Sequence, residues 1–170
     1  WNASEPISVI VRDAHEASKF TNQQISAQVC SALYCLVIRR FLFEETDKVT
    51  DLLISFYAEQ DMQEHGKALD DFYLDRPDLY SETKDSSGVF DSFWGASAIF
   101  AKNSKDFENA VIQGIILGND CEVMGYLVGS LVGVALGINE IPQRWLNQLD
   151  LSNEAEKVVT NFVRAVEKRN

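Results

Sequence analysis

The stretch DCEVMGYLVGSLVGVALGI, residues 120–138, carries Gly125, Gly129, Gly133 and Gly137 at strict four-residue spacing. Residues four apart lie near one face of a helix, so these glycines form a smooth face. Each glycine inside a helix costs about 1 kcal/mol relative to alanine, and close packing against another helix can offset that cost. The stretch therefore predicts a glycine-faced central helix that is the most buried of the domain and contacts another helix at backbone range.

The rest of the chain is also predicted to be helical, because apolar residues recur at helical spacing and no segment alternates long enough to require a strand. The segment 1–19 has no clear assignment, and residues 75–88 form a long polar loop. The expected helices span about 22–43, 47–66, 67–74, 89–101, 104–117, 142–149 and 153 onward. We predict one all-α domain over residues 1–170, an irregular orthogonal bundle around the glycine-faced helix.

The composition limits the partners. A net charge of −11 argues against a nucleic-acid surface and is unfavourable on an anionic membrane. The uncharged run 123–138 is shorter than the roughly 20 residues that span a bilayer. Cys30, Cys35 and Cys121 have no metal-binding spacing and are typical of reduced thiols in a cytoplasmic protein. We expect no nucleic-acid and no membrane partner.

Asp120 and Glu122 lie two residues apart at the start of the glycine-faced helix. Mg²⁺ prefers oxygen ligands and keeps several waters, so two carboxylates can form a large part of one site. The alternative is that Asp120 caps the helix and Glu122 is a first-turn charge, since both roles are favourable at a helix N-terminus. The local sequence leaves both interpretations open.

Four sequence motifs follow one another along the chain. They are Ser86-Ser87-Gly88, SKDFENA at 104–110, LGNDCEV at 117–123 and GINEIPQRW at 137–145. This order resembles the ADP-ribosylglycohydrolase family, in which a Ser-Gly segment opens a helix. A Ser-x-Asp-Phe-Glu start then leads to Leu-Gly-Gly-Asp-Thr-Asp-Thr, and Gly-x-x-x-Ile-Pro-x-x-Trp follows. Upstream, Asp13-Ala14-His15 resembles the Thr-His segment of the family.

The resemblance implies hydrolysis of the bond between ADP-ribose and an acceptor side chain, with Mg²⁺ as the cofactor. Asp120 and Glu122 would be metal ligands, while His15, Ser86, Ser87 and Gly88 would contact the ligand. The alternatives are a solvated His15 in a connecting segment and a plain turn at residues 86–88. No catalytic residue is assigned. The expected partner is ADP-ribose or an ADP-ribosylated protein.

Several positions depart from the family pattern. Glu122 replaces an Asp, Asn119 a Gly, and Val123 a Thr whose hydroxyl belongs to the metal shell in the family. The family's Gly-x-x-x-Gly-Asp and Thr-Asp-Asp segments do not occur. The chain therefore resembles the C-terminal half of such a protein with an eroded metal motif, weak or inactive alone. Self-association or a partner that supplies the missing half is expected. The alternative is a non-catalytic member that binds ADP-ribose or has a structural or interaction role.

Overall fold

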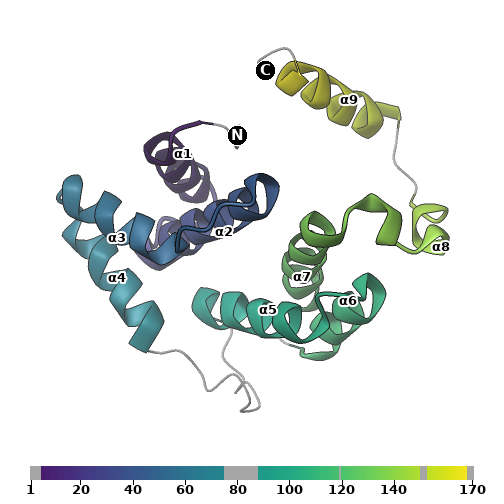
Figure 1. Cartoon of the computed structure of the whole chain (residues 1–170), viewed down its shortest axis with the longest axis horizontal. Coiled ribbons are helices and arrows are strands. Elements are labelled where there is room, and N and C mark those ends of the chain that lie inside the picture. Colours follow the sequence, from purple (N-terminus) through teal and green to yellow (C-terminus); the bar gives the residue numbers. More distant parts are fainter. Residues whose placement is uncertain (1–4, 75–87, 119, 150–152, 168–170) are drawn as a thin grey trace.

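The helices between residues 7 and 136 pack against one another (Figure 1). The structure, a computed structural model, describes residues 5–74, 88–118, 120–149 and 153–167. Every regular element in those ranges is helical, which confirms the all-α prediction. The elements are α1 (Ile7–Lys19), α2 (Ile25–Phe43), α3 (Val49–Glu59), α4 (Gln63–Leu74), α5 (Val89–Asn103), α6 (Phe107–Ile116), α7 (Cys121–Leu136), the 3₁₀ turn η1 (Ile138–Glu140), α8 (Gln143–Leu146) and α9 (Asn153–Glu167).

Helix α1 occupies part of the segment that the sequence left unassigned. Its buried residues Ile10, Val11, Ala14 and Ser18 follow a helical stripe and face α2 and the neighbouring helices. Isoleucine and valine near its start are β-branched residues, which favour strands and weaken the helical signal. The helix forms because this stripe is buried in the tertiary structure.

The boundary between the second and third predicted helices lies earlier than expected. Helix α3 ends at Glu59, and Asp61 has a φ of 53°, a left-handed conformation that stops a helix. Gly66 was expected to end this segment but lies inside α4. His65 consequently lies near the start of a helix rather than at its C-terminus.

A first hydrophobic cluster joins α1, α2, α3 and α4. Leu33 and Leu36 of α2 meet Leu53 of α3 and Phe72 of α4, and all four side chains are buried. Helix α2 contacts α1, α3 and α4 as well as α5 and α7. It is the one helix among the described residues with the length and apolarity of a membrane span, a test that the core helix of a soluble protein also passes.

A second cluster joins α5, α6 and α7, on the other side of the molecule from α1, α3 and α4 (Figure 1). The glycine face of α7 contacts α6, as predicted, but side chains of α6 meet it. A Cβ placed on Gly125 would lie 3.5 Å from Ile115 Cγ1, and one on Gly129 would lie 3.6 Å from Val111 Cγ2. Among the described glycines, the one whose added Cβ would lie near a neighbouring backbone atom is Gly114 of α6, at 3.5 Å from the Met124 carbonyl oxygen.

The expectation that the glycine-faced helix is the most buried one is wrong. Four of the 16 residues of α7 are buried, whereas seven of the 19 residues of α2 are. The reason is that α7 has α5, α6 and part of α2 around it, while α2 has five helices around it. The glycines permit a close helix pair without placing α7 at the centre of the core.

Candidate functional site

A cavity of about 430 Å³ opens between α1, α2, α5 and α7. Ala14 of α1 and Val123 of α7, which belong to segments selected from the sequence, line it, and so does Val89 of α5, which follows Gly88. Its other described lining residues come from the same helices and the α1–α2 turn: Ala17, Ser18, Thr21, Cys30, Ser31, Tyr34, Cys35, Ser92, Phe93, Tyr126 and Leu127. The fold thus brings Ala14, Val89 and Val123, neighbours of the predicted residues, to one cavity.

The described part of the lining is electrically neutral. It contains no Asp, Glu, Lys, Arg or His side chain. Burial raises the pKa of Cys30 to about 12 and, as the largest influence, raises the pKa of Tyr34 to about 12. Both groups therefore stay protonated and uncharged at neutral pH. The cavity offers aromatic faces, hydroxyls and thiols rather than charge.

A hydrogen bond between two hydroxyl groups joins α2 to α7 beside the cavity. The Tyr34 hydroxyl is hydrogen-bonded to Ser130 Oγ, which donates its own proton to the carbonyl of Tyr126 at 2.5 Å, with the carbonyl of Leu127 farther away at 3.3 Å. The rings of Tyr34 and Tyr126 lie 6.4 Å apart between centroids, with 32° between their planes. These contacts hold two aromatic rings at the cavity wall.

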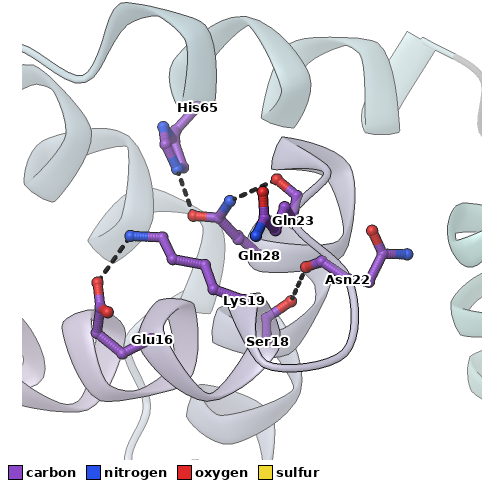
Figure 2. A network of polar contacts seen from close by, with 7 residues as sticks. All are labelled: Glu16, Ser18, Lys19, Asn22, Gln23, Gln28 and His65. Atoms are coloured by element: carbon purple, nitrogen blue, oxygen red, sulfur yellow. Dashed lines mark hydrogen bonds and ion pairs between the residues drawn. The ribbon is translucent and has the colours of Figure 1, made fainter.

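The turn between α1 and α2 is fixed by a polar network (Figure 2). Gln28 Nε2 donates to the Gln23 carbonyl at 3.0 Å, and His65 Nε2 donates to Gln28 Oε1 at 3.2 Å. Ser18 Oγ donates to the Asn22 carbonyl at 3.2 Å. Because these bonds order the end of α1, they position Ser18 and the adjoining turn at the edge of the cavity.

His15 lies away from the cavity lining. Its side chain is 3% exposed, and its Nε2 is 3.1 Å from the Tyr57 hydroxyl. The ring centroid of His65 is 4.8 Å from that of His15. The alternative of a solvated histidine in a connecting segment is wrong, because His15 belongs to α1 and is buried. Its contact with a ligand stays a prediction.

This histidine cluster predicts acid sensitivity. Burial, together with His65 and Lys19 and against Glu16, lowers the pKa of His15 to about 4. Burial and Lys19 also lower the pKa of His65, opposed by Glu64. A lowered pKa in the folded state means that the unfolded state binds more protons below the ordinary value of about 6.5. The stabilisation is present above that pH and is lost as the pH falls toward about 4.

We expect the free energy of unfolding to fall between about pH 6.5 and about pH 4, at up to about 1.4 kcal/mol per pH unit for each proton. Urea unfolding at a series of pH values measures this slope. In His15→Gln, which keeps all carboxylates, the slope should be smaller over the same range. An unchanged slope in that variant would assign the acid sensitivity to other groups.

Asp120 caps α7, as one of the two interpretations predicted. Its Oδ1 accepts a hydrogen bond from the backbone N–H of Val123 at 3.2 Å. Glu122 is an exposed residue in the first turn of α7. Neither carboxylate belongs to the described cavity lining, and their role as metal ligands stays a prediction.

The described residues do not form a complete Mg²⁺ site. Among the residues that the structure describes, no group of three or more His, Cys, Asp or Glu side chains could hold an ion. Val123, where the family has a hydroxyl, presents a hydrocarbon side chain to the cavity. Mg²⁺ requires oxygen ligands in near-octahedral geometry, and two exposed carboxylates would leave most positions to water.

Ser86 and Ser87 lie outside the described residues. Gly88 is the N-cap of α5 and is exposed. A Cβ at Gly88 would lie 2.7 Å from Asp91 Oδ2, so the position is closely approached by its own helix. Its predicted contact with a ligand remains untested, although the adjoining Val89 lines the cavity.

The cavity also contains residues that sequence reasoning did not select. Tyr34 lies in an apolar helix, Phe93 looks like a core residue, and Tyr126 lies in the glycine-rich stretch. No local motif marks them. The one sequence signal that could have indicated them is a tyrosine among small and apolar residues, because such a tyrosine places a hydroxyl group beside a buried apolar surface.

Two comparisons with known proteins agree with the motifs. The family model described as ADP-ribosylglycohydrolase matches residues 2–170. The chain is also similar to an ADP-ribosyl-dinitrogen reductase glycohydrolase of Rhodospirillum rubrum, at 38% identity over 50 residues. That segment is 29% of this chain and spans 17% of the length of the relative. No solved structure matches the chain. Because the family match covers nearly every residue, the chain belongs to the ADP-ribosylglycohydrolase family.

Proposed function

We propose that this protein recognises ADP-ribose or an ADP-ribosylated protein at the cavity between α1, α2, α5 and α7. The observation that carries the proposal is that Ala14 and Val123, from two family-like segments, line one cavity together with Val89, which follows Gly88. A volume of about 430 Å³ is within the range of small-molecule sites. The reaction class of the family is hydrolysis of the bond between ADP-ribose and its acceptor.

Hydrolysis by this chain alone is slow or absent in this proposal. The support is the short ligand set: Asp120 and Glu122 are exposed, and Val123 has no oxygen to offer. Replacing residues that only hydrogen-bond to the metal ligands already lowers metal affinity or activity by about 10–100-fold. Losing ligands themselves should weaken Mg²⁺ binding further, so we propose only weak Mg²⁺ binding at Asp120 and Glu122.

A second polypeptide segment, or a second copy of the chain, would supply the missing part of the site. The support is the exposure of large apolar side chains on the two helices that flank the acidic pair along the chain. Ile116 of α6 is 68% exposed and Tyr126 of α7 is 67% exposed. Exposed apolar surface is common at protein interfaces. The cytoplasmic location expected from the cysteines stays a prediction.

The test combines calorimetric titration of Mg²⁺ and ADP-ribose with release of ADP-ribose from a modified-arginine or modified-serine peptide. We expect ADP-ribose to bind, Mg²⁺ to bind weakly and the peptide to be cleaved very slowly or not at all. Asp120→Asn is the matched variant, because its side-chain oxygen can still cap the Val123 N–H. It should therefore leave the fold intact while removing one carboxylate.

Two results would contradict the proposal. Absence of ADP-ribose binding would remove the recognition function. Tight Mg²⁺ binding, with turnover abolished in Asp120→Asn, would show that the chain is an enzyme as it stands. The second candidate function is non-catalytic binding of ADP-ribose or a structural role, which the incomplete ligand set favours. Binding without turnover, even with a partner segment present, would select it.

A further inference from the structure

We infer that the cavity binds the neutral, ring-bearing part of its ligand, a nucleoside without its phosphates, and does so without a divalent cation. This inference deepens the proposed recognition of ADP-ribose and rests on it. It adds two properties that the family resemblance does not imply. The first is that the phosphates contribute little to the affinity, and the second is that Mg²⁺ contributes nothing.

Aromatic side chains in the cavity walls indicate a ligand with a flat ring. Tyr34, Phe93 and Tyr126 come from three different helices and line one cavity. A nucleobase is a flat ring that stacks on aromatic side chains whatever its sequence identity. Ser31 and Ser92 add hydroxyls that can exchange hydrogen bonds with ring nitrogens or ribose hydroxyls. This set suits a base and its sugar.

The absence of charged side chains in the described lining indicates that the cavity does not hold the phosphates. A diphosphate needs donors such as Arg, Lys, a metal ion or several backbone N–H groups. None of the described lining residues is cationic, and Asp120 and Glu122 are exposed and do not belong to the described lining. The net charge of −11 would moreover repel an anion over the whole surface.

Val123 contributes a hydrocarbon side chain to the cavity wall. It stands where the family has a metal-shell hydroxyl, and its side chain belongs to the cavity lining. The same substitution therefore weakens the cation site and adds hydrocarbon to the wall.

The experiment measures binding to the full chain by calorimetry with three probes: adenosine, ADP-ribose and ribose 5-phosphate. Each titration is run with Mg²⁺ and with EDTA. We expect adenosine to bind equally in both, and ribose 5-phosphate not to bind. At low salt, the affinity for ADP-ribose should be no higher than the affinity for adenosine. The two affinities should become similar near 1 M salt, where the screening length falls to about 3 Å.

Three variants locate the site. Tyr126→Ala should weaken adenosine binding by roughly 5- to 150-fold, the range found when a stacking ring is removed. Tyr126→Phe keeps the ring and should bind like the unaltered chain. Phe20→Ala removes an aromatic ring that is 91% exposed and outside the lining, so it should have no effect.

The outcomes separate the inference from the function on which it rests. Binding of ADP-ribose that requires Mg²⁺, or that occurs without any binding of adenosine, would overturn the inference and leave the proposed function standing. Binding of adenosine without ADP-ribose at any salt concentration would support the cavity chemistry and overturn the proposed function. Failure of both probes would overturn both.

Discussion

Replacing Phe72 with alanine should lower the free energy of unfolding by about 3–5 kcal/mol, the range for deletion of a buried aromatic ring. Phe72 is 1% exposed. Its ring stacks on Trp94 with 4.5 Å between centroids and meets Phe90 and Phe93 edge-on. Urea unfolding followed by tryptophan fluorescence measures the loss, which is a large part of a typical stability of 5–15 kcal/mol.

Phe20→Ala is the control for that experiment. Phe20 is 91% exposed, and surface substitutions usually change stability by no more than about 0.5 kcal/mol. A loss of less than about 1 kcal/mol in Phe72→Ala would show that the aromatic cluster does not hold α4 against α5. The cluster matters for function as well, since Phe93 faces both Phe72 and the cavity.

Replacing Gly114 with alanine should destabilise the protein, although alanine is the better helix former. A Cβ at Gly114 would lie 2.9 Å from Val128 Cγ2 and 3.3 Å from Val128 Cβ. Val128 is fully buried, and its branched side chain has little rotational freedom. Overpacking costs about 1–3 kcal/mol, against a helix-propensity gain of about 1 kcal/mol. We expect a net loss of up to about 2 kcal/mol by urea unfolding.

Gly66→Ala is the matched variant, because this glycine also lies inside a helix. A Cβ there would meet nothing within 4 Å. It should therefore raise the stability by about 0.5–1 kcal/mol through the propensity gain alone. The two substitutions are the same chemical change with opposite expected signs. Equal effects would mean that α6 and α7 are not in close contact at Gly114.

Much of the fold was predictable because helical periodicity is a local signal. The predicted helix 22–43 appears as α2, and the glycine-faced helix appears as α7 within one residue at each end. Burial was not predictable in the same way. The glycines of α7 indicated a close helix contact, but burial depends on how many helices surround an element, and α2 has five helices around it while α7 has three.

The sequence motifs did not indicate which side chains line the cavity, and the predicted site residues stay a prediction. Ala14 and Val123 belong to motifs selected from the sequence, and Val89 follows Gly88; all three line one cavity. Which side chain faces inward depends on the rotation of each helix about its axis. A shift of one residue turns a helix by about 100°, which is why Ala14 lines the cavity while His15 faces Tyr57.

The cavity has walls from both hydrophobic clusters, and this has a thermodynamic consequence. Ala14 and Cys30 belong to the first cluster, whereas Tyr34 and Leu127 pack against the second. A ligand that fills the space is bound only while the two clusters stay together. By mass action it adds RT ln(1 + [L]/Kd) to the stability, about 2.7 kcal/mol at a ligand concentration of 100 Kd. Occupancy of the cavity and cohesion of the two halves are therefore coupled quantities, so the melting temperature should depend on ligand concentration.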